Sequence, residues 1–428
     1  MNERIRDLGA LVLCVGVSIA NFLIFGLNHI RSWKDAQQYS TFASNLISGH
    51  GYSLDGSTFS TFREPGYPFF LAVLYRIFGN ENILAVCFIQ SLLLGVLGFL
   101  IYKTFEDWGY WKYGLAAALC ISGLPFYGFY TNEVVTELFY AFLLGVTFFI
   151  CARIAQRRGS AWYWFMFLGA LCGYTSLVRF QFVLFLPFII VVSLLLRRSY
   201  PPNTFRNILI ACVTAMIIIG PWVLYVHKET GKFTVTDGRQ EESLYARAVR
   251  AQLSYSDLTR YLKEWVVRSI SGGTGETEFL YRYEFKYLYS EYHRLAPDDT
   301  SAKKIQQEDI HAFITHPGTY LYSTLIEAIK LAYIEHDYSD STNRYLRASI
   351  YVLIYALFVF GFISLVLKRG ELRLLGCIAL TMLTYNFLVL SPFADVIPRL
   401  NTPYLMFYII MGFIGAALFR SDYGRLRA

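Results

Sequence analysis

The polar side chains best suited to chemistry lie just after the first long apolar run of the chain. Residues spaced by four, four and three positions share one face of a predicted helix there: Asp35, Tyr39, Ala43 and Leu46. A carboxylate on such a face can take a proton from a hydroxyl group within hydrogen-bond reach, as a general base does. Asp35 is therefore a candidate catalytic base. The spacing from Ser32 to Asp35 also fits a helix capping box, so a purely structural role stays open.

Three arginines lie at the predicted outer boundary of the apolar runs: Arg63, Arg179 and Arg399. Guanidinium groups bind phosphate oxygens in a bidentate manner and can stabilise a departing anion, so these arginines are candidates for phosphate or substrate binding. Glu64, which follows Arg63 directly, and Tyr39 are candidates for lining a substrate cavity. The alternatives are an ion pair between Arg63 and Glu64 at the membrane interface, side chains that extend to water, and an Arg179 that only anchors the topology.

Two further carboxylates, Glu133 and Glu137, are four residues apart near the start of a predicted apolar helix. On one helix they would share a face and repel each other, which favours a cation, a metal ion or a water-filled cavity between them. A charged group deep in a bilayer costs about 2.5 to 3.5 kcal/mol, so we expect Glu137 to face away from lipid. The alternative is that both carboxylates lie in the headgroup region.

The composition indicates the fold class that must position these groups. Of 428 residues, 55% are hydrophobic and only 16% are charged, whereas a soluble domain has roughly 25% charged residues. The apolar runs predict an all-α, polytopic membrane helix bundle of about ten transmembrane helices. They lie at 8–29, 82–104, 113–130, 134–153, 161–178, 181–197, 206–226, 347–368, 372–391 and 403–420. The formal charge of +7 is distributed between these runs, which does not favour nucleic acid binding.

Basic residues in the short connections predict the orientation. Alternate connections contain the clusters Arg157-Arg158, Arg197-Arg198 and Lys368-Arg369, whereas the short turns on the opposite side hold only Arg179 and Arg399. This bias predicts a multi-pass protein of the plasma (inner) membrane with both termini in the cytosol. Every candidate site residue then lies on the non-cytosolic face.

The chain is predicted to be a single membrane domain, 1–428, with two large segments outside the membrane, 30–81 and 227–346. The first is expected to contain a helix near 32–46 and an interfacial helix near 69–78. The second has helical signals at 240–252, 256–271 and 299–315, and an interfacial helix from Pro317 to His336. Its alternating aromatic residues, Tyr281 to Tyr289, would share one side of a strand and either stack on sugar rings or pack in a core.

The order of residues in the first outer segment resembles a known superfamily. The pattern comprises Asp35, Tyr39, Ala43, Leu46, Gly49, Gly51-Tyr52, Arg63-Glu64-Pro65-Gly66-Tyr67-Pro68 and Phe78-Gly79. It resembles the first outer loop of the C-type (GT-C) glycosyltransferases, which use polyprenyl-phosphate sugars and include protein O-mannosyltransferases and lipid A aminoarabinose transferases. The resemblance implies a GT-C-like fold, a lipid-linked donor, an inverting transfer, and Asp35 as the base that acts on the acceptor.

Other functions stay open at this point. A transporter or flippase of a lipid-linked or anionic substrate would show repeated halves and charges deep in the bundle, both weak or absent here. An O-antigen polymerase or ligase type of enzyme would leave the pattern from Asp35 to Gly79 unexplained. The acceptor is undefined. Some relatives bind a divalent metal ion, but the sequence offers no convincing ligand set for one.

Overall fold

The computed structural model describes residues 3–25, 34–156, 161–195, 204–236, 239–271, 277–332, 344–393 and 398–425. These residues form helices and loops with no β-strand, and a single isolated bridge joins Ser53 and Phe59. The predicted all-α fold class is confirmed. The described chain forms two compact units: residues 1–236, 354–383 and 402–428 make up unit 1, and residues 237–353 and 384–401 make up unit 2.

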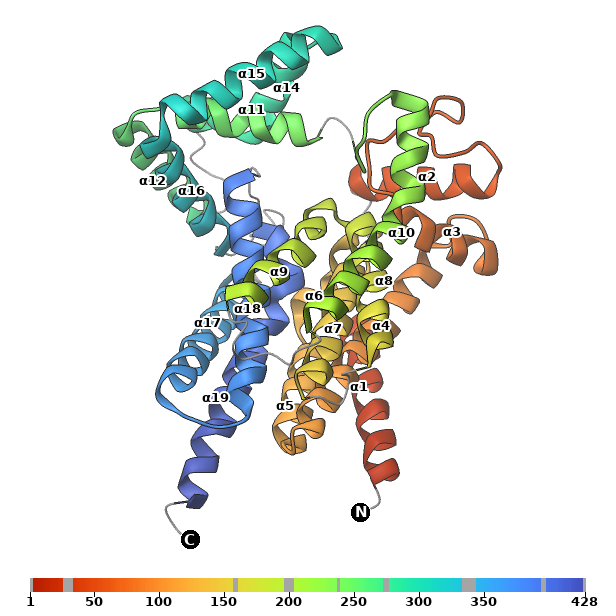
Figure 1. Ribbon diagram of the computed structural model, residues 1–428, viewed down its shortest axis with the longest axis vertical. Helices are drawn as coiled ribbons and strands as arrows, with labels where there is room; N and C mark the ends of the chain where they lie inside the picture. Colours follow the sequence, from red (N-terminus) through yellow and green to blue (C-terminus); the bar gives the residue numbers. More distant parts are fainter. Residues whose placement is uncertain are drawn as a thin grey trace. The chain divides into compact units, whose positions relative to one another are not determined.

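The first part of unit 1 is a series of helices that the reader can follow from red to yellow-green in Figure 1. They are α1 (Glu3–Phe25), α2 (Lys34–Ile47), α3 (Gly66–Phe78), α4 (Ile83–Asp107), α5 (Trp111–Ser122), α6 (Pro125–Thr131), α7 (Thr136–Ala155), α8 (Trp162–Val178), the 3-10 helix η1 (Phe180–Leu184), α9 (Phe185–Leu195) and α10 (Thr204–Thr230). The chain re-enters unit 1 in parts of α17 (Arg344–Leu367) and α18 (Leu372–Phe393) and in α19 (Leu405–Arg425).

Unit 2 contains the helices of the segment between α10 and α17. They are α11 (Arg239–Ala251), α12 (Tyr255–Ser271), α13 (Glu278–Tyr283), α14 (Phe285–Leu295), α15 (Asp299–Thr315) and α16 (Pro317–Ala332), together with the 3-10 helix η3 (Pro398–Tyr404) that it shares with unit 1. The buried carboxylate of Glu327 on α16 lies 3.0 Å from Arg250 of α11 and 3.0 Å from Lys330. The contact with Arg250 joins α11 to α16, and the contact with Lys330 lies within α16.

Seven helices of the described chain are long and apolar enough to cross a membrane: α1, α4, α7, α10, α17, α18 and the helix that ends at Arg420. The span expected at 113–130 is instead a pair of helices, α5 and α6, bent by 50°. The bend has a local cause, since Leu124 is extended and Pro125, which has no N–H group to donate, opens α6. The helices expected at 161–178 and 181–197 are shorter apolar helices within the described residues, Trp162–Val178 and Phe180–Val191.

Helices of unit 1 pack closely where small residues meet. A methyl group added at Gly169 of α8 would lie 2.1 Å from the carbonyl oxygen of Ala211 in α10, and one at Gly173 would lie 2.9 Å from that of Ala215. Such contacts between small residues are typical of helices packed inside a membrane. They fix α8 against α10, and the C-terminal end of α8 carries one of the candidate arginines, Arg179.

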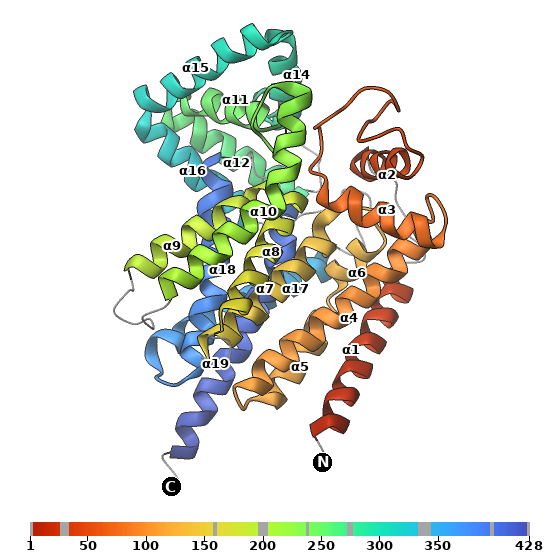
Figure 2. The same ribbon diagram turned by 45° about the vertical axis from the view of Figure 1, so that its right-hand side comes forward.

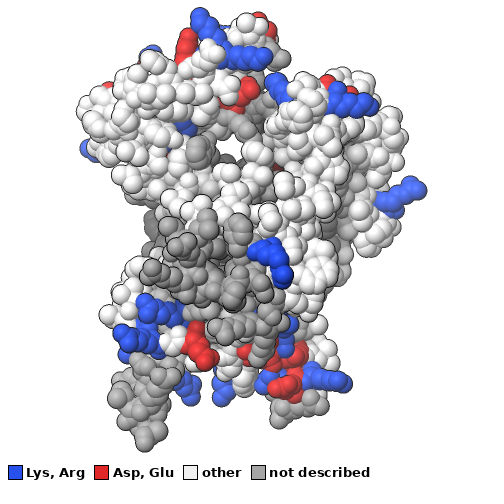
Figure 3. Space-filling model, viewed as in Figure 1, with Lys and Arg blue, Asp and Glu red and all other residues white. Residues whose placement is uncertain are grey.

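Charged side chains mark the end of unit 1 where α1 begins. Lys103 of α4 contacts Asp7 at 2.8 Å, and Arg6 contacts Glu106. In the space-filling view, basic and acidic side chains gather at this end of unit 1, and the surface between it and the α2 end is largely uncharged (Figure 3). Helices α2 and α3 lie at the opposite end of unit 1 (Figure 2).

Candidate active site

Asp35 lies in the first turn of α2, whose predicted apolar face is present. Tyr39 and Ala43 are buried on that face, and the carboxylate of Asp35 retains 18% exposure. Ser32 lies outside the described residues, so the capping alternative is not decided by the structure. Asp35 is thus a partly accessible carboxylate on an otherwise buried helix face.

Arg63 is the ion-pair partner of Asp35. Its Nη2 atom donates to the Asp35 carboxylate and its Nε atom donates to the side-chain oxygen of Gln38 at 2.9 Å. The guanidinium carbon lies 4.9 Å from the ring centroid of Tyr39, and only 1% of Arg63 is exposed. Because both the charge and the planar face of Arg63 are engaged by α2, Arg63 orients the Asp35 carboxylate.

The segment from Arg63 to Pro68 contacts both α2 and the C-terminal end of α8. Gly66 opens α3 at a point where an added Cβ atom would lie 2.7 Å from the backbone of Leu177 and Val178. Only glycine permits this approach. The Tyr174 hydroxyl donates to the Gly66 carbonyl oxygen at 2.9 Å, and the Phe180 amide approaches the Glu64 carboxylate at 3.5 Å. The motif thereby places Glu64 beside the residue that follows Arg179.

Arg179 leaves α8 in an extended conformation and turns its side chain toward α7. Its Nη2 atom lies 2.8 Å from a carboxylate oxygen of Glu137, and its Nε atom donates to Thr136 at 3.0 Å. The guanidinium also lies 5.1 Å from the ring centroid of Tyr140. The buried Nη1 atom has no hydrogen-bond partner among the residues that the structure describes. A buried guanidinium with an unused donor is suited to an anionic ligand.

The structure corrects the expectation for Glu133 and Glu137. Helix α7 begins only at Thr136, and Val135 is extended, so the two carboxylates do not occupy successive turns of one helix. Both are buried, and the cation beside Glu137 is Arg179. No group of three or more His, Cys, Asp or Glu side chains suited to a metal ion occurs within the described ranges.

Arg399 belongs to η3, and its side chain lies outside what the structure describes. The alternating aromatic residues from Tyr281 to Tyr289 do not form a strand but fall on the two helices α13 and α14. The other predicted site residues all belong to unit 1: Asp35, Tyr39, Arg63, Glu64, Glu133, Glu137 and Arg179.

The sequence analysis assigned no role to three polar groups that hold the site. Gln38 and Thr136 accept hydrogen bonds from the two arginines, and the hydroxyl of Tyr52 donates to the carbonyl oxygens of Arg63 and Glu64. Burial raises the pKa of Tyr52 well above its usual value, so its hydroxyl stays a donor at every physiological pH. Gln38 lies three residues after Asp35 on the same helical face, and this spacing is the sequence feature that could have indicated its role beside Asp35.

A protein family and several solved structures are similar to this chain. Residues 63–225 match a family model described as dolichyl-phosphate-mannose-protein mannosyltransferase, a match that covers less than half of the chain. The structure is similar to the archaeal oligosaccharyltransferase AglB from Archaeoglobus fulgidus in complex with an inhibitory peptide and a dolichol-phosphate, with a TM-score of 0.56 and 11% identity. The predicted resemblance to the C-type glycosyltransferases is confirmed.

The structural similarity to AglB covers nearly the whole of this chain at low sequence identity. The AglB match covers 99% of this chain and 51% of that chain, so this chain spans about half the length of the archaeal transferase. AglB tethered with an acceptor peptide gives a TM-score of 0.55 at 12% identity, covering 99% of this chain and 50% of that one. ArnT from Cupriavidus metallidurans bound to undecaprenyl phosphate gives 0.45 at 13% identity, with coverages of 96% and 78%. No curated protein matches the sequence.

Proposed function

We propose that this chain is a membrane glycosyltransferase that moves a sugar from a polyprenyl-phosphate donor to an acceptor at the non-cytosolic face. The observation that carries the proposal is the pairing of Asp35 with Arg63 on the loop that also brings Glu64 to the end of α8 beside Arg179. An inverting transfer is helped by a base for the acceptor hydroxyl and a cation for the departing phosphate, and Asp35 and Arg179 of unit 1 are the candidates for these two roles. The match of residues 63–225 to a mannosyltransferase family model supports the same chemistry.

In the proposed reaction the acceptor oxygen attacks the anomeric carbon from the side opposite the phosphate. The bond between that carbon and the phosphate oxygen breaks, which inverts the anomeric configuration and releases polyprenyl phosphate. Asp35 takes the proton of the acceptor hydroxyl as general base. The departing phosphate gains negative charge, which a positioned cation stabilises.

The contacts give the two described arginines different roles in this proposal. Arg63 donates through Nε and Nη2 to side chains of α2, so we assign it to holding Asp35 rather than the donor. Arg179 keeps a buried donor atom without a partner among the described residues, and we assign the donor phosphate to it. Arg399 belongs to unit 2 and stays a separate candidate, proposed from the sequence, for phosphate or substrate binding. Tyr39, Glu133 and Glu137 complete the proposed lining of the site in unit 1.

The orientation in the membrane is part of the proposal. The basic clusters that the sequence contains in alternate connections support cytosolic termini in the plasma (inner) membrane, and α2 and α3 lie at the end of unit 1 opposite the start of α1. With this orientation, the proposed donor lipid lies in the outer leaflet. The partners are the donor lipid and an acceptor whose chemistry the site residues do not define.

The test is product formation by purified protein in detergent. Undecaprenyl-phosphate mannose, glucose and aminoarabinose are supplied as donors, with a total membrane extract as the acceptor source, and released undecaprenyl phosphate is quantified. A transferase releases it in detergent with no membrane gradient. Movement of intact donor across sealed vesicles, without release in detergent, would instead support a flippase and contradict the proposal.

A further inference from the structure

Tyr52 lies in the turn that reverses the direction of the chain after α2. Gly49 and Gly51 have φ values of +82° and +72°, a left-handed backbone that reverses the chain after α2. Asn45 donates to the carbonyl oxygen of Ser53 at 2.9 Å and closes this turn. The reversal buries the Tyr52 side chain, which is 3% exposed.

The hydroxyl of Tyr52 binds two consecutive peptide groups. It donates to the carbonyl oxygen of Arg63 at 3.0 Å and to that of Glu64 at 3.2 Å, so one hydrogen is shared by two acceptors. Residues 61–65 belong to no helix or strand. The backbone of these two residues therefore lacks the regular hydrogen bonds that would otherwise fix its position, and the Tyr52 hydroxyl supplies a substitute.

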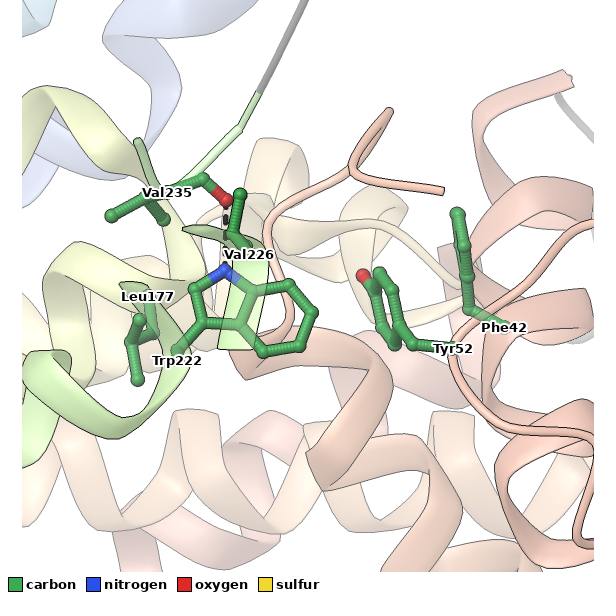
Figure 4. Close-up of a cluster of buried hydrophobic side chains, with 6 residues drawn as sticks. All are labelled: Phe42, Tyr52, Leu177, Trp222, Val226 and Val235. Atoms are coloured by element: carbon green, nitrogen blue, oxygen red, sulfur yellow. Dashed lines mark hydrogen bonds between the residues drawn. The ribbon is translucent and has the colours of Figure 1, made fainter. Parts of the chain in front are cut away.

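The ring of Tyr52 is itself held by neighbouring elements. It stacks on Phe42 of α2 with centroids 4.2 Å apart, and its edge meets Trp222 of α10 at 4.9 Å. The Trp222 Nε1 atom donates to the carbonyl oxygen of Val235 at 2.8 Å, which fixes the indole in turn (Figure 4). The hydroxyl consequently has a defined position relative to the helix that carries Asp35.

We propose that Tyr52 is a positioning residue of the active site. Its hydroxyl fixes the peptide between Arg63 and Glu64, so that the Arg63 side chain reaches Asp35. The inference rests on the proposed function, because a positioning role has meaning only if Asp35 acts in the reaction. The Tyr52 hydroxyl binds backbone carbonyl oxygens of Arg63 and Glu64, and through that backbone it sets the position of the Arg63 side chain.

The test is a double-mutant cycle between Tyr52→Phe and Asp35→Asn. Tyr52→Phe keeps the packed ring and removes only the hydroxyl. We expect turnover to fall on the order of tenfold, below the roughly hundredfold cost of a 1 Å misplacement at a catalytic group. If Tyr52 acts through Arg63 and Asp35, this loss should disappear in the Asp35→Asn background, whereas a general effect on the fold would persist there.

Tyr75→Phe is the matched control. Tyr75 is also buried in the first outer loop region, and its hydroxyl bonds the Ser40 hydroxyl at 2.8 Å without touching Arg63 or Glu64. We expect this variant to keep wild-type turnover. Melting temperatures of all variants are recorded on the same preparations.

The outcomes separate the inference from the proposed function. If Asp35→Asn is inactive but Tyr52→Phe turns over like Tyr75→Phe, or its loss persists in the Asp35→Asn background, only the role of Tyr52 is overturned. If the wild-type protein releases no undecaprenyl phosphate from any of the three donors, or Asp35→Asn is fully active, the proposed function fails and the inference fails with it.

Discussion

Gly66→Ala perturbs the contact that joins the first outer loop to α8. The added Cβ atom would lie 2.7 Å from the carbonyl carbon of Leu177 and from the amide nitrogen of Val178. Both atoms belong to the backbone, so no side-chain rotation relieves the clash. To reach an ordinary contact of about 3.4 Å, the start of α3 must move away from α8 by about 0.7 Å.

This displacement should separate Glu64 from the Phe180 amide, which already lies at 3.5 Å. We expect a loss of stability of about 1 to 3 kcal/mol, the usual cost of overpacking. Turnover should fall by more than stability explains, approaching the roughly hundredfold cost of a 1 Å misplacement. Gly220→Ala is the control, because its Cβ atom would meet nothing within 4 Å in α10.

The assay compares melting temperature in detergent and release of undecaprenyl phosphate for both variants. Gly220→Ala should match the wild-type protein in both measurements. A Gly66→Ala protein with normal stability and normal turnover would refute the reasoning, since it would mean that the contact between α3 and α8 does not position the site.

Three further predictions concern binding, pH and topology. Arg179→Ala should weaken undecaprenyl phosphate binding by about 1.5 to 3 kcal/mol, the worth of a hydrogen bond to a charged group, whereas Arg76→Ala, which removes an exposed arginine of α3, should not; equal affinities in a binding titration would remove Arg179 from the site. Burial raises the pKa of Asp309 in α15 from 3.8 to about 7, so its stabilising contribution is complete below about pH 4 and is lost as the pH rises through 7. Wild-type protein should therefore melt at a lower temperature at pH 8 than at pH 5, and Asp309→Asn should lessen that difference; identical pH profiles would contradict this account. In a cysteine-free background, a cysteine at Ser57 should react with an impermeant maleimide from outside the cell and one at Lys112 only after permeabilisation, and the reverse pattern would invert the proposed active face.

Hydrophobic periodicity predicted much of the helical fold. The helices expected at 240–252, 256–271 and 299–315 correspond to α11, α12 and α15 within one residue at each end. Periodicity works there because one apolar face packs inward along a whole helix. It was wrong for Tyr281 to Tyr289, where aromatic residues at alternate positions fit both a strand and two short helices, and local spacing does not distinguish them.

The partners of the charged residues could not be predicted from the sequence. Arg63 and Asp35 are 28 residues apart, and Arg179 and Glu137 are still farther apart, so each pair forms only when α2, α3, α7 and α8 pack. Val135 is extended, so Glu133 lies before the helix that contains Glu137. No Gly or Pro residue between them indicates this break in the sequence. The residue types indicated chemistry, but tertiary packing decides that Arg63 pairs with Asp35 and that Arg179 pairs with Glu137.

The most direct test of the central proposal is turnover by Asp35→Asn. The amide preserves the size of the side chain but cannot take the acceptor's proton, so transfer should fall by a factor on the order of 10² to 10⁴, the usual worth of general-base catalysis. Asp55→Asn is the control, because Asp55 lies in the same loop and its hydrogen bonds are local, to Ser57 and Thr58, whose amides donate to it at 2.9 and 2.7 Å.

The measurement is release of undecaprenyl phosphate, with melting temperature and undecaprenyl phosphate affinity recorded on the same preparations. The account predicts that Asp35→Asn lowers the melting temperature somewhat, because the buried Arg63 loses its counter-charge. Turnover of the folded protein should nevertheless fall by the full factor, while its lipid affinity stays near that of the wild-type and Asp55→Asn proteins. Near-normal turnover by Asp35→Asn would contradict the assignment of Asp35 as the base.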